Sequence, residues 1–416
     1  MPGISKPTPL NSQQLRLLAV LALTNFVNFA ARHAVIPLIP LLRDYLHATD
    51  AQLGLLQTWL LVVLAAASIP FGFMADRLSR KAIIAVGIFF WSVASFAGGM
   101  VSTFFLFAIA RAMVGLGEAA YAPAAQSMIS GAFPQERRAF AQAIFATGML
   151  LGGAAGLAFG GMVGPRYGWQ TTLFATAVLG VLPALALFGL EDPPRGPRSE
   201  VVPIRRLLSV PAFVAMMAAG ICITFSSVSL ISWGVDFAVN YKDFSLREAS
   251  VSLALITLLA LVLGVLVGGY VADRLHRSFS YGRVIAIAVA LLLATPFLLL
   301  AIQSEEKPVV LFGLAVACFF MSWYHGPVTA VLHDMMPRRA HATSIGVYMF
   351  ATQLIGGLGP HIVGRISDLH DLQLGLQIAV AVMVCGALLM LLVIHFIRRD
   401  GLRHPTLEAF HAEPGD

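Results

Sequence analysis

The chain of 416 residues is 58% hydrophobic and only 12% charged, with a mean hydropathy of +0.82. This composition excludes a soluble protein, because the surface of a soluble domain of this length needs far more polar residues. The net charge of +6 could indicate a nucleic-acid partner, but 19 of the 27 Lys and Arg residues fall in segments on one side of the predicted membrane spans. That asymmetry follows the positive-inside rule, so it predicts cytoplasmic termini and no nucleic-acid partner.

Apolar runs of about 20 residues, the length that crosses a bilayer core, recur along the chain. We therefore predict an all-α polytopic protein of the cell membrane with twelve spans, at 16–40, 52–75, 82–101, 104–130, 140–163, 169–190, 210–238, 248–272, 282–303, 308–333, 342–365 and 373–397. The widest polar interruption divides the spans six and six. The predicted domains are an N-terminal bundle at 1–190, a cytoplasmic linker at 191–209, a C-terminal bundle at 210–397 and a cytoplasmic tail at 398–416.

The two halves share a motif at corresponding places. Span two ends in GFMADRLSRK (72–81) and span eight in GGYVADRLHR (268–277), and the basic loops after spans four and ten carry Pro134 and Pro337, 203 residues apart. Such an internal duplication is typical of transporters that hold a substrate between two six-helix halves. The motif predicts a conformational latch on the cytoplasmic side, the alternative being a solvated anchor. Its candidate residues are Asp76, Arg77, Arg80, Asp273, Arg274 and Arg277.

Span four contains two opposite charges, Arg111 and Glu118, two helical turns apart on one face. Each costs roughly 2.5–3.5 kcal/mol near the middle of a membrane helix, so we expect them to face protein or water. Arg32 of span one lies at a similar predicted depth. We expect Arg32 and Arg111 to hold an anionic headgroup; the alternative is that one pairs permanently with Glu118 while the other binds helix carbonyls.

Proton coupling is assigned to two residues. Glu118 is the candidate proton-responsive switch, and His325, in the middle of span ten, is the histidine to test, although an intramembrane histidine is more often a hydrogen-bonded helix contact. Asn28 and Tyr121 are candidate polar contacts for a substrate, and Trp233, Trp323 and Tyr324 could form an apolar wall for an acyl chain. Packing between helices is the alternative for all five.

The sequence resembles the major facilitator superfamily, and within it the Spinster-like branch. The carrying residues are Asn25, Asn28 and Arg32, RAMVGLGEAAYAP (111–123), FPQERR (133–138), DPPRG (192–196), YHGPVTAVLHDMMPRRAHAT (324–343) and GPHIVGRISD (359–368). The resemblance implies a transporter of lysophospholipid- or sphingolipid-like amphiphiles, proton-linked in some members. Ala31 stands where the family pattern has an acidic residue before the arginine of span one.

We therefore expect a secondary active transporter that works by alternating access on an amphipathic anionic lipid. The alternative is a proton-coupled symporter of small organic anions, because RxxxGxGEA in span four also resembles anion:cation symporters. The spans contain no HExxH motif or other catalytic or metal-ligating pattern, so we expect no enzyme activity, cofactor or metal. The expected partners are the substrate, membrane lipid and, if transport is coupled, protons, with the protein acting as a monomer.

Overall fold

The computed structural model describes residues 11–193 and 202–400, and the predicted tail beyond Asp400 lies outside them. These residues form helices connected by short turns, which confirms the all-α prediction. The first group of helices is α1 (Ser12–His33), η1 (Ile36–Leu38), α2 (Ile39–Leu46), α3 (Asp50–Arg77), α4 (Arg80–Gly98), α5 (Phe104–Ala132), α6 (Gln135–Tyr167), α7 (Trp169–Leu179) and α8 (Val181–Phe188).

The second group follows the central polar segment, in which α9 (Ile204–Leu208) is a short helix. Its members are α10 (Pro211–Tyr241), α11 (Leu246–Ser278), α12 (Gly282–Gln303), α13 (Lys307–Met321), η2 (Ser322–Tyr324), α14 (His325–Met335), η3 (Arg338–Ala340), α15 (His341–Ala351), the π-helix η4 (Thr352–Gly356), α16 (Gly359–Leu369) and α17 (Leu372–Asp400). The last helix, α17, runs past residue 397, where the predicted C-terminal bundle ends.

Local sequence signals fix where several helices begin. A capping box satisfies free backbone N–H groups when the side chain before the first turn and the side chain three residues later exchange hydrogen bonds with each other's backbone. Three helices begin in this way, with the pairs Asn11 and Gln14 at α1, Thr49 and Gln52 at α3, and Ser245 and Glu248 at α11.

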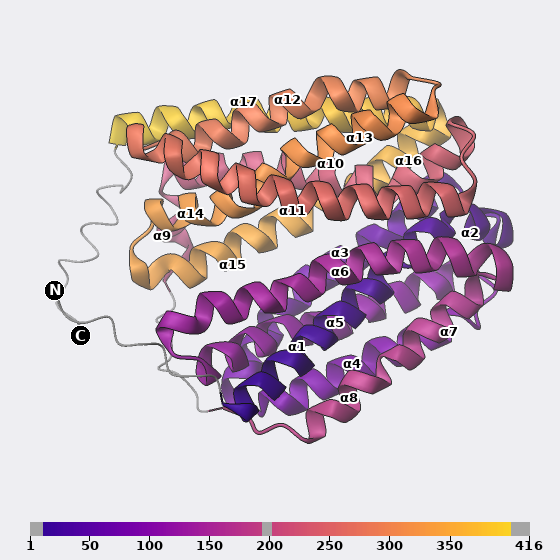
Figure 1. Ribbon diagram of the computed structural model, residues 1–416, viewed down its shortest axis with the longest axis horizontal. Helices are drawn as coiled ribbons and strands as arrows, with labels where there is room; N and C mark the ends of the chain where they lie inside the picture. The colour runs from indigo at the N-terminus through magenta and orange to yellow at the C-terminus, as the bar shows by residue number, and fades with distance from the viewer. Residues whose placement is uncertain (1–10, 194–201, 401–416) are drawn as a thin grey trace.

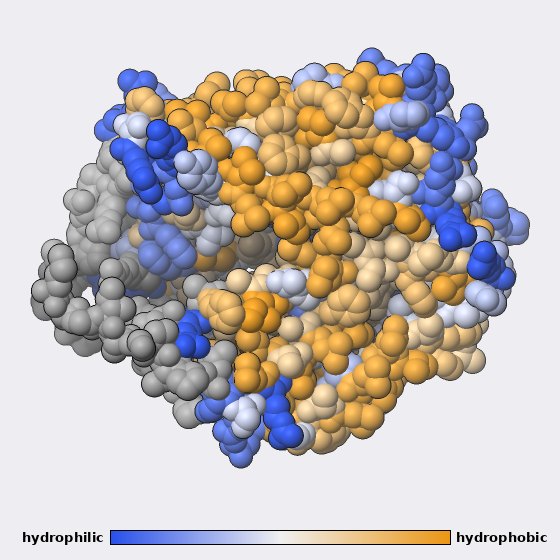
Figure 2. All heavy atoms as spheres, viewed as in Figure 1, coloured by the Kyte–Doolittle hydropathy of each residue, from blue (hydrophilic) through white to orange (hydrophobic). Residues whose placement is uncertain are grey.

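Eleven stretches of the described residues are long and apolar enough to cross a membrane. The predicted span at 342–365 is occupied by α15, η4 and α16, and the π-helical turn divides it into pieces too short to span alone. In Figure 2 apolar side chains cover the middle of the molecule, and polar side chains gather at its two ends. That distribution is the one expected of a protein embedded in a bilayer.

The two groups of helices lie side by side and meet at one end (Figure 1). The contacts between them involve α3 against α16, α6 against α11 and α10 against η1. Hydrogen bonds between the two groups join α2 and α3 to α10, to α16 and to the turn before α16. These bonds lie toward the α2 end of the molecule, away from the chain termini. These contacts close the molecule at the α2 end.

Glycine recurs at every fourth residue of α6, at Gly148, Gly152, Gly156 and Gly160, and this glycine repeat packs against α1. A Cβ atom on Gly152 would lie 2.2 Å from the carbonyl oxygen of Phe26, and one on Gly156 would lie 2.1 Å from that of Ala30. The two backbones approach too closely for any side chain at these positions. The repeat thus holds α1, which carries Arg32, firmly against the rest of the first half.

Candidate functional site

A buried ion pair joins α1 to α5 within the first half. An Nη2 donor of Arg32 binds Oε2 of Glu118, and their side chains are 13% and 2% exposed. The guanidinium of Arg32 also lies 4.7 Å from the ring centroid of Phe29, one turn earlier on α1. The alternative reading of the sequence had one arginine paired with Glu118 and the other bound to helix carbonyls. In the structure Arg32 is the arginine that pairs with Glu118.

Arg111 is the other arginine of this cluster, and no described residue forms an ion pair with it. The residue is 4% exposed, its Nε has no acceptor, and the described residues provide neither an ion pair nor a helix carbonyl for its guanidinium. Oε1 of Glu118 is also buried without a donor. Two guanidinium groups therefore share one carboxylate, leaving a net positive charge in a buried place. An unpaired buried charge is costly, so an anion placed beside Arg111 would be stabilised.

Close packing of backbones fixes the position of α5. A Cβ atom on Gly115 would lie 2.4 Å from the carbonyl oxygen of Leu60 in α3, and one on Gly117 would lie 2.8 Å from that of Gly87 in α4. The structure places helices there, so the glycines position Arg111 and Glu118 between two close neighbours.

The predicted polar contacts of the first half differ in their surroundings. Asn28 is buried with an Nδ2 that has no acceptor among the described residues, so it keeps hydrogen-bonding capacity near Arg32. The hydroxyl of Tyr121 donates to the carbonyl oxygen of Leu21 at 2.8 Å, and its ring packs edge-on against Trp91. Tyr121 therefore contributes to helix packing in this conformation.

The predicted aromatic wall of the second half also contains side chains that form hydrogen bonds and one that has a free donor among the described residues. Trp233 is fully buried, and its Nε1 donates to the carbonyl oxygen of Pro360 at 2.9 Å. Trp323 packs on α11, with a buried Nε1 that has no acceptor among the described residues. The hydroxyl groups of Tyr324 and Tyr348 form a hydrogen bond. His325 is exposed at the start of α14, with its ring 5.7 Å from that of Tyr324.

Arg80 is the member of the predicted latch that is tightly bound within the first half. Its side chain is 1% exposed, and its Nε and backbone N–H donate to the two carboxylate oxygens of Asp192, each at 2.8 Å. Nη1 donates to the carbonyl oxygen of Ser127 at 3.1 Å. Arg80 thus ties the start of α4 to the end of α5 and to the segment after α8. Arg77 is exposed, and the side chain of Asp76 lies outside the described residues.

The second half has a similar ionic cluster built on Arg283. This side chain binds Asp273 of α11 at 2.8 Å and Asp334 of α14 at 2.5 Å. Arg274 and Arg277 are exposed, and the described residues give neither an ion pair. The sequence analysis missed Arg283, although it follows Arg80 by 203 residues, the spacing that separates the two loop prolines. Each cluster lies within one half in this conformation.

A second set of charges joins the halves at the α2 end. Arg43 of α2 donates from Nη1 and Nη2 to the two carboxylate oxygens of Asp236 on α10, at 2.9 and 2.8 Å. Its Nε and Nη2 also bind Oδ1 of Asp50 at the start of α3, at 3.0 and 2.8 Å. The Asp236 side chain is 1% exposed. A bidentate contact of this kind with a buried carboxylate is strong and geometrically specific.

The start of α3 is also bound to α16. The carboxylate of Asp368 accepts hydrogen bonds from the backbone N–H groups of Asp50 and Ala51, at 2.8 and 2.9 Å. A carboxylate at a helix N-terminus is stabilised by the free N–H groups and by the helix dipole. The hydroxyl of Ser367 donates to Asp50, and a ring nitrogen of His361 lies 2.8 Å from the Ala51 carbonyl oxygen. These contacts, with Arg43, close this end of the molecule.

The arrangement of two helical halves, with a buried charged cluster in the first half, matches a known family. The sequence profile of the Major Facilitator Superfamily matches residues 21–360. The chain belongs to the Major Facilitator Superfamily. It is therefore an integral, multi-pass membrane protein and a transporter of small molecules, and the family consists of transporters and not enzymes.

Individual relatives support the predicted resemblance to the Spinster-like branch. The chain is 27% identical to the protein spinster homolog 1 of Bos taurus over 88% of this chain and 75% of that protein. It is 26% identical to the sphingosine-1-phosphate transporter SPNS2 of Xenopus tropicalis over 84% of this chain and 73% of that protein. It superposes with a TM-score of 0.84 on a bacterial homolog of the human lysosomal transporter Spinster, at 22% identity over 94% of this chain and 99% of that one. The last comparison confirms the fold.

Proposed function

We propose that this protein moves an amphipathic anionic lipid, of the lysophospholipid or sphingolipid type, across the membrane by alternating access. The observation that carries the proposal is the buried guanidinium of Arg111, which has no counter-ion among the described residues. A phosphate or carboxylate group matches the planar fork of an arginine and would neutralise the charge of the cluster. The similarity to the sphingosine-1-phosphate transporter SPNS2 of Xenopus tropicalis supports a lipid carrying such a group.

The ion cluster at the α2 end supports alternating access. Arg43, Asp50 and Asp236 join the two halves there, whereas the ionic clusters of Arg80 and Arg283 at the other end each stay within one half. With both termini in the cytoplasm, as the charge asymmetry predicts, the end that these contacts close is the outer one. Breaking the Arg43 contacts would then be required for the outward-open state.

Proton coupling is part of the proposal and rests on Glu118. Protonation of its carboxylate removes the negative charge that holds Arg32, so a second guanidinium becomes free to bind the substrate. Ala31 cannot exchange a proton. Among the described residues of the cluster, Glu118 is the acidic group that contacts an arginine, which makes it the group through which protons and substrate would be linked.

The test is thermal stabilisation of the purified protein by a panel of lysophospholipids and of small organic anions. A ligand that binds the folded state raises the melting temperature in proportion to the logarithm of its concentration over its dissociation constant. We expect stabilisation by lysophospholipids that carry a free phosphate, and its loss in Arg111→Gln. Arg166→Gln, which removes an exposed arginine at the end of α6, is the matched control and should behave like the unmodified protein.

The other outcomes separate the alternatives. Stabilisation by small organic anions alone would favour the symporter of small anions over a lipid transporter. Stabilisation by lysophospholipids that persists in Arg111→Gln would show that the headgroup binds elsewhere, and would refute the assignment of Arg111.

A further inference from the structure

Asp236 is a buried carboxylate whose cation belongs to the other half of the molecule. Its side chain is 1% exposed, and Nη1 and Nη2 of Arg43 donate to its two oxygens at 2.9 and 2.8 Å. Asp236 lies on α10 in the second half, whereas Arg43 lies on α2 in the first. When the halves separate at the α2 end, the guanidinium therefore leaves, and the carboxylate loses the charge that compensates for its burial.

Asn240 stays with Asp236 when the halves separate, because both residues lie on α10. Its Nδ2 donates to Oδ1 of Asp236 at 3.0 Å, from one turn along the helix. The amide is neutral and has both donor and acceptor atoms, so it can bind a carboxylate or a protonated carboxyl group. Asp236 thus keeps a hydrogen-bond partner in either protonation state after Arg43 has left.

The other charges at the α2 end do not replace Arg43. The charged groups that act on Asp236 among the described residues are Arg43 and Asp50, and Asp50 adds a second negative charge. Lys242, at the end of α10, binds Glu305 instead. The nearby titratable groups of α16 contact the backbone of α3; they are Asp368 and His361. Once Arg43 has left, a proton can therefore neutralise Asp236.

Solvent reaches this pair from the α2 end. The side chains of Arg43 and Asp50 are 27% and 18% exposed, in contrast to 1% for Asp236. The guanidinium thus covers the buried carboxylate on the side of the solution. Its departure opens the route along which a proton arrives.

We propose that Asp236 is a proton-binding site and that the proton competes with Arg43 for it. The proposal rests on the alternating access inferred above. When the α2 end opens, the carboxylate takes up one proton from the solution at that end; when it closes, the guanidinium displaces the proton, which returns to the same solution. No proton crosses the membrane in this exchange, so it is separate from the coupling proposed for Glu118. Because the open state binds the extra proton, acid favours opening.

Pulsed electron paramagnetic resonance at different pH values tests the site in the full chain without substrate. Spin labels at Ser102 and Gln303, in a background without the native cysteines, give the separation of the halves at the α2 end. We expect a short distance at about pH 8 and a growing longer population toward about pH 5. The ratio of open to closed molecules should rise by up to about tenfold per pH unit, the limit for one proton. Asp236→Asn should remove this dependence, because the amide takes up no proton in this range.

Infrared difference spectra between the same two pH values observe the proton itself. One component of the C=O stretch of protonated carboxyl groups should appear at the lower pH in the unmodified protein and be missing in Asp236→Asn. This measurement does not depend on how far the variant opens. It therefore decides the proposal even if Asp236→Asn is open at every pH.

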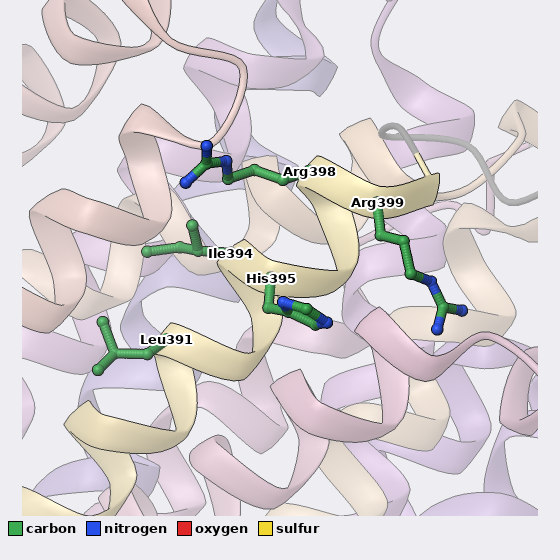
Figure 3. Close-up of a pocket in the computed structure, with 5 residues that line it drawn as sticks. All are labelled: Leu391, Ile394, His395, Arg398 and Arg399. Carbon is green, nitrogen blue, oxygen red and sulfur yellow. The ribbon is translucent and has the colours of Figure 1, made fainter.

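Matched variants separate Asp236 from the other titratable groups. Asp368→Asn removes a second carboxylate that joins the halves, but one that accepts backbone N–H groups instead of a guanidinium, so it should keep the pH dependence. Histidines titrate in the same range. His361→Gln at the α2 end should therefore keep the dependence, as should His395→Gln near Arg398 and Arg399 in the last turns of α17 (Figure 3).

A pH dependence that persists unchanged in Asp236→Asn would overturn the proposal, as would its absence in the unmodified protein. An equal loss in Asp368→Asn or in a histidine variant would also overturn it, because the proton would then act elsewhere.

Two further outcomes separate this proposal from the one on which it rests. Glu118→Gln should keep the pH dependence; a loss confined to that variant would overturn the role of Asp236 and support the coupling role of Glu118. The absence of a longer population even in Arg43→Met would refute alternating access at this end, and the proton site with it.

Discussion

Replacing Arg43 by Met removes the ionic contacts that join α2 and α3 to α10. The variant keeps an unbranched apolar stem of similar length but leaves Asp236, whose side chain is 1% exposed, as a buried carboxylate without its cation. Breaking a buried pair in this way costs about 3–5 kcal/mol. Only the closed arrangement contains the pair, so the equilibrium should shift toward opening at the α2 end by about a hundredfold or more.

Pulsed electron paramagnetic resonance measures the shift directly. Spin labels at Ser102, between α4 and α5, and at Gln303, at the end of α12, report the separation of the two halves at the α2 end, in a background without the native cysteines. We expect a single short distance in the unmodified protein and a longer population in Arg43→Met. Asp236→Asn keeps hydrogen-bonding capacity but loses the charge attraction, so it should shift the distribution less.

Arg247→Met is the matched control. This arginine is exposed at the start of α11, at the same end of the molecule, and the described residues give it no ion pair. If Arg43→Met and Arg247→Met give the same distance distribution as the unmodified protein, the Arg43 contacts do not hold the halves together and the reasoning fails.

Three further predictions concern coupling and folding. Glu118→Gln should abolish the dependence of substrate uptake into proteoliposomes on a pH gradient, because the amide cannot exchange a proton; an unchanged dependence would exclude Glu118 as the coupling group. Arg80→Ala should lower the free energy of unfolding by about 3–5 kcal/mol, since it leaves buried partners unpaired, whereas Arg77→Ala should change it by less than about 0.5 kcal/mol; equal effects in thermal melts would contradict the ionic cluster. Gly115→Ala places a Cβ atom 2.4 Å from a backbone carbonyl oxygen of α3 and should cost about 1–3 kcal/mol, while Gly72→Ala, with open space around it, should not destabilise the protein in the same melts.

Much of the candidate site was accessible from the sequence, because a charge inside an apolar span is conspicuous. Arg111 and Glu118 could be recognised without a structure, and their helical spacing placed them on one face. Which arginine pairs with Glu118 could not be predicted. The pairing depends on how closely α1 approaches its neighbours, and the glycine repeat of α6 sets that distance. Such a distance is known only once the helices are packed together.

The charges that join the halves were harder to find. Arg43 and Asp50 fall near the ends of predicted spans, where charged side chains are ordinary, and 193 residues separate Arg43 from Asp236. Neither composition nor spacing distinguishes such residues from solvated ones. Their significance appears only when the two bundles are placed together.

The sequence by itself determined the membrane location, the all-helical fold and the division into two related halves. Hydropathy and a duplicated motif can both be recognised from the order of the residues alone. The tertiary structure alone decided which charges are paired, that Arg111 has no partner among the described residues, and which end of the molecule is closed. The physical reason is that apolar periodicity acts locally, over a turn or a span. Pairing of charges depends on long-range packing between helices, which a pattern of residues does not specify.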